Sequence, residues 1–400
     1  MSEDSQPDVE PFPVPRERLF STPSVYPQWR KEGPVRRVAI REEGWAWAVT
    51  RYDDVKAVLN SEHTSANRLD PRFPNLRAGV VTFPNANIMH MDAPEHTRYR
   101  RMLMPEFSGR RIKAIQSEIK QIADEAVDRL LASDQPADFY QTVALPTPSR
   151  VICLLLGIGY ENHDVFESLT KQLLDMTTSL EDFRSGVDKA AAFMRAEVEK
   201  QRDKPGDGVI GKLIAERVST GEITQEQVVG FAMLILIGGH EATAKAITLG
   251  MVSLLNEPEK ADAIRRDPGL MSGAIEEVLR VHTITDLTTP KLAITDMTVG
   301  GCPIRAGEGI IPLVASANHD PDVFPDPENF DPSREFKGHL TFGSGSHFCL
   351  GQNLARMEME AVYSTVLRRI PSLRLAVPVE ELELDRKAVV WGVKSLPVAW

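Results

Sequence analysis

Apolar residues between about positions 94 and 285 recur mainly at three- and four-residue steps, the spacing of amphipathic helices. The clearest stripe lies within 112–132 and consists of Ile112, Ile115, Ile119, Ile122, Ala126 and Leu130. The same spacing predicts helices over 143–158, 163–178 and 184–202. The longest predicted helix begins at Thr224, which can form a capping box with Gln227, and continues to about Leu255.

Short alternating segments predict strands and hairpins at 46–52, at 290–313 and in the tail from 385 to 400. A further helix is predicted over 351–369. The chain has no Pro/Gly/Ser-rich linker and no internal repeat. We therefore expect one large, mainly α domain over residues 1–400, with a smaller β portion at each end. Residues 1–11, acidic and proline-rich, are expected to form a disordered tail.

Composition excludes several classes of partner and compartment. The formal net charge of −11 argues against nucleic acid and against a polybasic membrane surface. The most apolar runs, at 151–159 and 231–239, are shorter than a membrane span, and the first residues lack the pattern of a signal peptide. The cysteines, Cys153, Cys302 and Cys349, are too few for a disulfide framework. We expect a cytoplasmic protein, and a monomer is the default.

Cys349 lies in the segment TFGSGSHFCLGQNLAR, residues 341–356. A lone cysteine is most often a small buried hydrophobe, a zinc site would need further ligands nearby, and His347 is only a weak partner for a nucleophile. The neighbouring glycines allow close backbone approach, and the start of the helix over 351–369 favours a thiolate. Phe342 and Phe348 offer flat apolar surface. Together these features suit an iron porphyrin.

The stretch FGSGSHFCLG resembles the haem-binding signature of the cytochrome P-450 family. The resemblance covers about residues 12–400 and is closest to soluble actinobacterial members. It implies a haem b held between the long central helix and the helix that follows the cysteine, with Cys349 as iron ligand. Phe342, Gly343, His347 and Gly351 would contact the haem. It also implies dioxygen as co-substrate and electrons from a ferredoxin, supplied through a ferredoxin reductase from NAD(P)H.

Two other segments resemble the same family. HMDAPEHTRYRRML, at 90–103, resembles the helix whose His96 and Arg100 contact the haem propionates, and Lys291 takes the place of an arginine that usually does the same. Glu277 and Arg280 in EEVLR share one helix face, which by itself is typical of a solvated surface pair. The family resemblance adds Arg334 to this ion pair.

Rival motifs are incomplete. HEATA at 240–244 lacks the second histidine of a zinc protease, and GIGYEN at 157–162 lacks the third glycine of a dinucleotide loop. GSGSHF at 343–348 does not fit a dinucleotide loop either.

LIGGHEATAKA resembles the family's oxygen-activating segment. Gly238 and Gly239 would open the helix beside the iron, although they also suit close packing against a neighbour. Glu241 would relay protons or act as a structural ion-pair partner. Ala242 replaces the usual threonine, and Thr243 points about 100° away around the helix. A substrate hydroxyl or an ordered water would then complete the relay; otherwise the enzyme uses peroxide, or performs something other than hydroxylation. A non-catalytic haem sensor is the remaining alternative.

The resemblance places the substrate pocket in the 64–90 loop, the 163–200 helices, the segment after the Glu277–Arg280 helix and the tail at 391–393. Its candidate residues are Ile88, Leu236, His240, Asp286, Thr289 and Val393. His240 is as well explained as a packing histidine. These segments are largely apolar, so we expect a mid-sized apolar substrate bearing some oxygens, such as a polyketide, terpenoid or steroid-like secondary metabolite, which is hydroxylated or epoxidised.

Residues 98–113 reverse the overall sign of the charge. The segment has one acid, Glu106, and six basic residues, namely Arg98, Arg100, Arg101, Arg110, Arg111 and Lys113. It is either an ordinary solvated face or the docking surface for an acidic ferredoxin.

Overall fold

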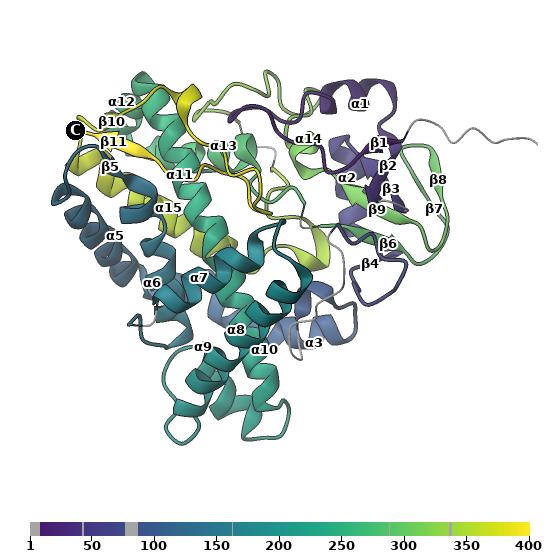
Figure 1. The fold of residues 1–400 in the computed structure, drawn as a ribbon, viewed down its shortest axis with the longest axis horizontal. Coiled ribbons are helices and arrows are strands. Elements are labelled where there is room, and N and C mark those ends of the chain that lie inside the picture. Colours follow the sequence, from purple (N-terminus) through teal and green to yellow (C-terminus); the bar gives the residue numbers. More distant parts are fainter. Residues whose placement is uncertain (1–8, 42–43, 77–86, 162, 288, 336–337) are drawn as a thin grey trace, which may run out of the picture.

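The structure is a computed structural model that describes residues 9–41, 44–76, 87–161, 163–287, 289–335 and 338–400. Helices dominate it, as the sequence predicts (Figure 1). The helices of the first half are α1 (Tyr26–Glu32), α2 (Tyr52–Asn60), α3 (Glu95–Leu103), α4 (Gly109–Ala114), α5 (Gln116–Leu131), α6 (Pro146–Leu156), α7 (His163–Leu174) and α8 (Leu180–Lys200). The helices of the second half are α9 (Val209–Leu213), α10 (Gln225–Gly239), α11 (Glu241–Asn256), α12 (Pro258–Arg266), α13 (Met271–His282), α14 (Val314–Asn318) and α15 (Gln352–Arg369).

The sequence predicts a separate β portion at each end of the chain. This prediction is wrong in one respect, because strands from distant parts of the chain share one sheet. The strands are β1 (Glu10–Pro11), β2 (Val35–Arg41), β3 (Gly44–Val49), β4 (Thr64–Ser65), β5 (Ala137–Asp138), β6 (Lys291–Ala293), β7 (Met297–Val299), β8 (Cys302–Ile304), β9 (Gly309–Pro312), β10 (Arg374–Leu375) and β11 (Pro397–Ala399). The largest sheet has the order β1-β2-β3-β9-β6-β4 and lies to one side of the helices (Figure 1). Strand β6 of this sheet begins at Lys291, one of the residues that the resemblance assigned to the haem propionates.

The two ends of the chain also differ from expectation. Most of the expected tail at 1–11 lies outside the described residues, but Glu10 and Pro11 form strand β1, paired with Val38 and Ala39. The tail at 385–400 makes two isolated antiparallel bridges, one between Ala388 and Asp175 and one between Val393 and Leu384. Its last strand, β11, joins β10 and β5 in a three-stranded sheet.

Two predicted helices are each interrupted once. The stripe over 112–132 is buried as predicted, but Ile115 separates α4 from α5. The helix that starts at Thr224 has the predicted capping box with Gln227, and His240, at φ −87° and ψ −79°, separates α10 from α11. The interruption therefore falls inside the GGHEA segment.

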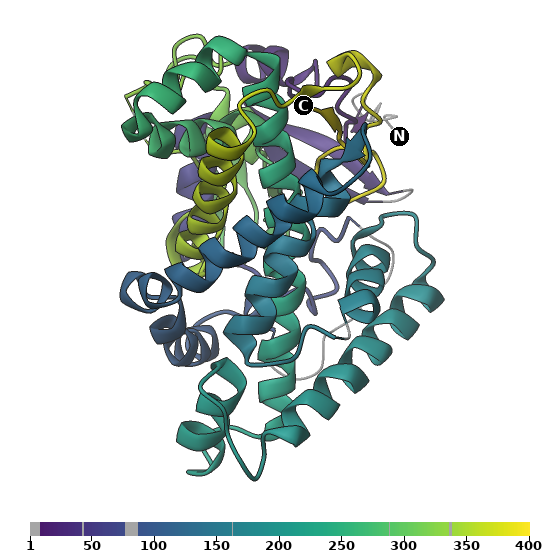
Figure 2. The ribbon, with the colours of Figure 1, turned by 90° about the vertical axis from the view of Figure 1, so that its left-hand side faces the viewer.

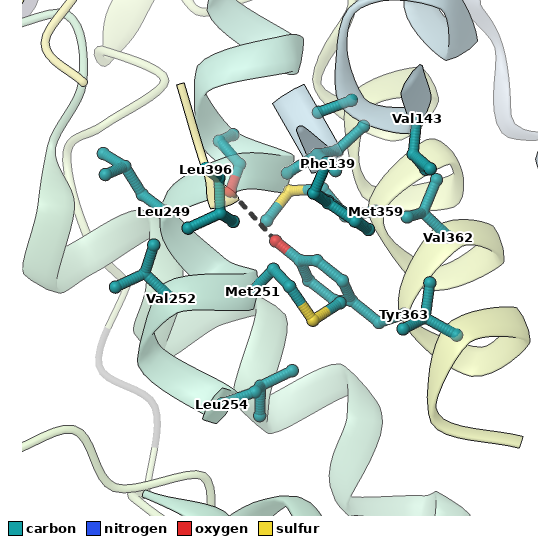
Figure 3. Close-up of a cluster of buried hydrophobic side chains, with 14 of the residues drawn as sticks. Phe139, Val143, Leu249, Met251, Val252, Leu254, Met359, Val362, Tyr363 and Leu396 are labelled. Atoms are coloured by element: carbon teal, nitrogen blue, oxygen red, sulfur yellow. Dashed lines mark hydrogen bonds between the residues drawn. The ribbon is translucent and has the colours of Figure 1, made fainter. Parts of the chain in front are cut away.

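One of the four hydrophobic clusters of the described residues includes the contact of α11 with α15 (Figure 3). Tyr363 of α15 donates a hydrogen bond from its hydroxyl to the carbonyl of Ala246, over 2.9 Å. A Cβ at Gly250 would lie only 2.0 Å from that hydroxyl oxygen, so glycine is needed for this approach. The contact fixes α15, and with it the cysteine loop that leads into this helix, against the central helix.

The segment Gln225–Asn256 is long and apolar enough to cross a membrane on length and composition. However, 67% of its most apolar window is buried inside the protein. Figure 2 shows the segment passing between the other helices, the position of a core helix.

Candidate active site

The loop before α15 folds back so that Cys349 lies beside the start of that helix. Gly343 and Gly345 have φ of +72° and +71°, which favours glycine, and the backbone N–H of Cys349 donates to the carbonyl of Phe342 over 2.8 Å. The side chain of Cys349 is partly buried. Desolvation raises the pKa of its thiol, while the backbone N–H groups of Gly351 and Gln352 act against that rise.

Cationic and imidazole groups from three elements converge beside this loop. His96 and Arg100 lie on α3, Lys291 on β6, and His347 two residues before the cysteine. The ring centroids of His96 and His347 are 4.2 Å apart, and Nη2 of Arg100 donates to the carbonyl of Phe348. The structure thus brings the three residues that the resemblance assigned to the propionates, His96, Arg100 and Lys291, close to His347, which it assigned to haem contact.

This cluster carries excess positive charge. Burial lowers the pKa of Lys291 to about 8, with a further lowering from Arg68 and an opposite effect of Asp92. Burial, together with Lys291, His96 and Arg100, lowers the pKa of His347 to about 3. The Nε2 atom of His96 is buried and lacks a hydrogen-bond partner within the described residues. A dianionic group would satisfy these charges and this orphaned nitrogen.

The central helix has accessible surface at the predicted oxygen-activating segment. Most of α10 and α11 is buried, yet Gly238 is exposed and a Cβ there would meet nothing within 4 Å in the described structure. Ala242 is partly accessible, whereas Thr243 is 6% exposed. At Gly239 a Cβ would lie 2.5 Å from Cδ1 of Ile152 on α6, which agrees with the packing explanation. The two glycines therefore have different surroundings.

Glu241, the first residue of α11, is 7% exposed and has polar partners on two sides. The hydroxyl of Tyr140 donates to its Oε1 over 2.6 Å, and Nζ of Lys245 lies 3.6 Å from the same oxygen. Burial, with Glu241 nearby, raises the pKa of Tyr140 strongly, so its hydroxyl stays a donor. Both of the predicted roles, relay and ion-pair partner, remain compatible with this position.

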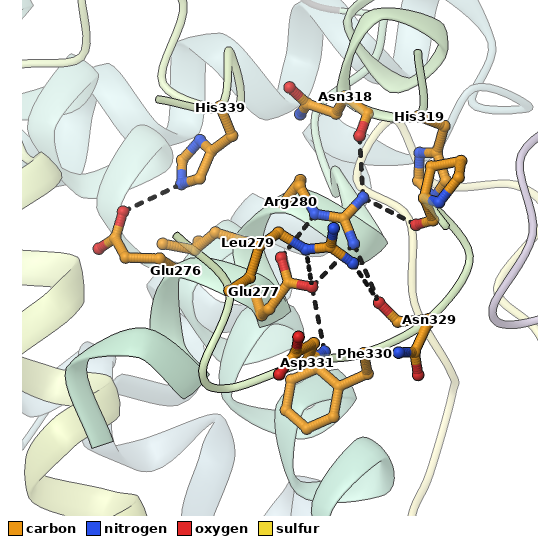
Figure 4. A network of polar contacts seen from close by, with 12 residues as sticks. Glu276, Glu277, Leu279, Arg280, Asn318, His319, Asn329, Phe330, Asp331 and His339 are labelled. Atoms are coloured by element: carbon orange, nitrogen blue, oxygen red, sulfur yellow. Dashed lines mark hydrogen bonds and ion pairs between the residues drawn. The ribbon is translucent and has the colours of Figure 1, made fainter. Parts of the chain in front are cut away.

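The predicted ion pair on α13 is present and fully buried (Figure 4). Nε of Arg280 lies 2.6 Å from Oε2 of Glu277, and Nε of Arg334 lies 2.8 Å from Oε1. Arg280 also donates to the carbonyl groups of Asn318, over 3.0 Å, and Pro327, over 2.7 Å. This network fastens the long segment before the cysteine loop to α13.

The neighbouring residue Glu276 connects α13 to the site itself. Nη2 of Arg356 on α15 donates to its Oε2 over 2.9 Å, and the Arg356 guanidinium lies 4.6 Å from the centroid of the Phe342 ring. Nε2 of His339 lies 3.4 Å from the same Oε2 atom of Glu276 (Figure 4). Arg356 thereby supports the ring that the resemblance assigned to a haem wall.

A family model described as Cytochrome P450 matches residues 24–194 and 269–380. The chain belongs to the cytochrome P450 family. A vitamin D3 dihydroxylase from Streptomyces griseolus is 38% identical to this P450 over 98% of this chain and 97% of the relative. Pentalenic acid synthase from Streptomyces avermitilis is 37% identical over 97% of each. The crystal structure of the mycinamicin VIII C21 methyl hydroxylase of Micromonospora griseorubida, bound to mycinamicin VIII, matches with a TM-score of 0.93 and 34% identity, covering 98% and 100%.

These matches confirm the predicted fold class and the resemblance to actinobacterial members. This P450 is an oxidoreductase of the monooxygenase type, and family membership implies haem and oxygen-dependent chemistry. Its residues fit such a group: a thiol, four groups suited to carboxylates, and an orphaned nitrogen at His96. Within the described ranges, no three His, Cys, Asp or Glu side chains lie together in a way that could hold a metal ion.

The six pocket candidates of this P450 have unlike surroundings. Both ring nitrogens of His240 and the hydroxyl of Thr289 are buried without partners in the described part of the chain. The apolar candidates are packed into hydrophobic clusters, namely Ile88, Leu236 and Val393. The 64–90 loop falls partly outside the described residues, at 77–86.

Asp286 has contacts that do not support its assignment to the pocket. Its Oδ1 accepts from the backbone of Ala315 over 2.7 Å and its Oδ2 from the hydroxyl of Tyr26 over 3.3 Å. This carboxylate therefore joins the segment after α13 to α1 and to the start of α14.

The basic segment of this P450 is only partly paired. Arg111 lies 3.2 Å and Lys212 2.8 Å from the carboxylate of Glu106. Arg98, Arg101, Arg110 and Lys113 are exposed. Met104, 50% exposed, and Phe348, 37% exposed, add apolar surface in this segment and directly before the cysteine.

Sequence reasoning missed Lys245, Asp385 and Arg356 in this P450. Lys245 had a detectable signal, because it is a single charge within the apolar run ATAKAITLGM. Asp385 and Arg356 had none, since their partners lie far away in the sequence.

Proposed function

We propose that this P450 binds haem b through the thiolate of Cys349 and inserts one oxygen atom into a mid-sized, largely apolar secondary metabolite. The observation that carries the proposal is the group of His96, Arg100, Lys291 and His347 beside Cys349. Four groups that suit anionic carboxylates, one with an orphaned nitrogen, gather next to a thiol at a helix start. Haem has the matching arrangement of an iron and two carboxylates.

Haem supplies the reductive activation of dioxygen, and a thiolate ligand favours cleavage of the O–O bond. The residues of the chain bind the cofactor, exclude water and transfer protons to the oxygen site. His96, Arg100, His347 and Lys291 orient the propionates, and Phe342, braced by Arg356, forms a flat wall. Glu241 holds the proton supply, and the missing hydroxyl at Ala242 is replaced by a substrate hydroxyl or an ordered water.

The substrate class rests on the pocket candidates and on the relatives. Ile88, Leu236 and Val393, which are buried in hydrophobic clusters, would stand behind an apolar pocket wall, while His240 and Thr289 have buried polar atoms without hydrogen-bond partners in the described structure. A buried imidazole or hydroxyl without a partner is costly, so a substrate oxygen bound there would be favoured. The relatives' names refer to vitamin D3, pentalenic acid and mycinamicin VIII, and these names agree with oxygenation of a mid-sized secondary metabolite.

The electron donor would be an acidic ferredoxin, itself reduced by NAD(P)H through a ferredoxin reductase. Its docking surface would be the exposed Arg98, Arg101, Arg110 and Lys113, together with Phe348 beside the cysteine. Exposed charges of this kind steer encounters and are screened by salt. A cytoplasmic location agrees with this donor.

Carbon monoxide binding and turnover together test the proposal. The reduced protein with carbon monoxide should give the red-shifted Soret band of thiolate ligation, and Cys349→Ser should abolish it. With ferredoxin, reductase and candidate secosteroids, terpenoids or macrolides, product should carry oxygen from dioxygen, and its rate should fall steeply with added salt. A normal band without turnover under either ferredoxin or peroxide supply would favour a sensor.

A further inference from the structure

Lys245 is a fully buried cation on α11, one helical turn after Glu241. It is 1% exposed, and its ammonium group lies among three partners, one on its own helix and two on the C-terminal segment. Nζ lies 3.6 Å from Oε1 of Glu241, 3.1 Å from Oδ2 of Asp385 and 2.7 Å from the carbonyl oxygen of Val393. A buried ammonium is retained only where such partners offset the loss of hydration.

The contacts form a continuous polar chain from the interior to the surface. Tyr140 donates to Glu241 over 2.6 Å, and the Lys245 ammonium lies 4.5 Å from the centroid of the Tyr140 ring. Asp385, at the other end, has a side chain that is 21% exposed. Lys245 therefore stands between two carboxylates, one buried beside the predicted oxygen-activating segment and one in reach of water.

The geometry around Lys245 leaves its side chain little freedom. A Cβ at Gly392 would lie 2.5 Å from Cδ of Lys245, so the stem of the lysine lies directly on that glycine. The backbone N–H of Asp385 donates to the carbonyl of Gly392 over 2.8 Å, which holds the two sides of this turn together. The lysine thus clamps the C-terminal segment, including Val393 of the predicted pocket, to the central helix.

We propose that Lys245 is a positioning residue for Glu241, which it holds with Oε1 directed towards the Tyr140 hydroxyl, and that Asp385 competes for the same ammonium group from the solvent side. The proposal rests on the proposed monooxygenase function only in giving Glu241 a task; the electrostatic relationship stands without it. The Lys245 ammonium is an opposite charge beside the Glu241 carboxylate, and Asp385, which binds the same ammonium, is a like charge. Removing either one should shift the protonation of Glu241 in opposite directions.

Other ionisable groups face Glu241 and remain unchanged in the test. They come from three elements besides the lysine and the C-terminal segment, and they are Tyr140, Glu167 and His240. Burial lowers the pKa of His240 to about 4, so this group stays neutral near pH 7 and adds no cation beside Glu241.

The test follows the carboxyl group of Glu241 directly by infrared spectroscopy of the purified haem protein over a range of pH. The carbonyl band of the protonated group is assigned by its loss in Glu241→Gln. In Lys245→Met the midpoint of this band should move up, because an opposite charge is lost. In Asp385→Asn it should move down, because the remaining ammonium then serves Glu241 alone.

Lys394→Met is the matched control, since Lys394 forms an exposed pair with Glu383 on the same C-terminal segment. It should leave the midpoint unchanged. A midpoint that stays in place, or moves the same way in both test variants, would overturn the proposal. If Lys245→Met does not fold, the downward shift in Asp385→Asn decides alone.

Turnover separates this proposal from the proposed function. The alkaline shift in Lys245→Met should also appear in the pH profile of product formed per reducing equivalent consumed. If both variants show the expected infrared shifts but the parent protein forms no product, the proposed function is contradicted and the role of Lys245 is not. A parent that forms product while neither variant shifts the band would contradict only the role of Lys245.

Discussion

The imidazole rings of His96 and His347, from α3 and from the cysteine loop, lie with their centroids 4.2 Å apart. Neither ring is a cation near neutral pH, because burial and the nearby Arg100 and Lys291 lower the pKa of both. The two histidines therefore act as neutral hydrogen-bonding groups, and the fixed positive charge of the cluster comes from Arg100 and Lys291. Of these two cations, Lys291 is the one that loses its charge near pH 8.

We expect haem affinity to fall as the pH rises above about 8, where Lys291 of the protein loses its proton. Its pKa lies below the usual value for lysine, so the charge that attracts a propionate is present below about 8 and lost above it. Lys291→Arg should remove this decline, because an arginine stays charged. Lys291→Met should weaken haem binding on the order of tenfold at neutral pH. Haem transfer to a scavenging apoprotein measures all three. An identical decline in the arginine variant would contradict this assignment.

The sequence alone supports those parts of the site that lie within one short segment. The cysteine loop, the turn from His96 to Arg100 and the pair of Glu277 with Arg280 are local patterns, and the structure keeps each together. A glycine with positive φ, such as Gly343, follows from the same kind of local constraint.

Contacts between residues that are distant in the sequence could not be predicted from it, and the wrong expectation of separate β portions has this cause. The sheet joins β3 to β9, and no alternation pattern encodes which strand is the neighbour. The contacts of the Asp286 carboxylate with Ala315 and Tyr26, which lie far away in the sequence, could not be predicted either. Lys245 was visible as a charge within an apolar run, but Asp385, its partner on the C-terminal segment, was not.

Ala242→Thr tests how protons reach the oxygen site. If a substrate hydroxyl replaces the missing threonine, the new hydroxyl is redundant and product formed per reducing equivalent should change by less than about twofold with that substrate. It should rise with a substrate analogue that lacks the hydroxyl. A marked rise with the hydroxylated substrate itself would count against substrate assistance. Ala244→Thr, two residues further along α11 at a fully buried position, controls for general disturbance of the helix.

Glu276 should give the protein part of its resistance to acid. Desolvation alone would raise the pKa of this carboxyl, but hydrogen bonds from His339 and Arg356 outweigh it and bring the pKa to about 2, from an ordinary value of 4.5. Because the folded-state pKa is depressed, the stabilisation is complete above the ordinary value and is lost as the pH falls towards 2. Glu276→Gln should cost roughly 3 kcal/mol of unfolding free energy at neutral pH. The difference from the parent should vanish in acid.

Denaturant unfolding of the Glu276→Gln and parent proteins across this pH range measures the effect. Glu381→Gln, at an exposed position, is the control and should match the parent throughout. A cost for Glu276→Gln that does not change with pH would show that the ionised carboxylate is not its source.

Gly250→Ala should destabilise the fold more than an ordinary helix substitution. Alanine is the better helix former by about 1 kcal/mol, so propensity alone predicts a gain. At Gly250, however, the new Cβ would lie 2.0 Å from the Tyr363 hydroxyl, whose hydrogen bond to Ala246 would have to break or α15 would have to move. Overpacking of this kind costs about 1–3 kcal/mol. Gly109→Ala, where a Cβ meets nothing within 4 Å in the described structure, should show the gain instead. Thermal unfolding of both variants measures the contrast, and Gly250→Ala combined with Tyr363→Phe should recover part of the loss because the phenylalanine lacks the clashing oxygen. Equal stability of the two alanine variants would mean that α15 can move away from Gly250 without a loss of unfolding free energy.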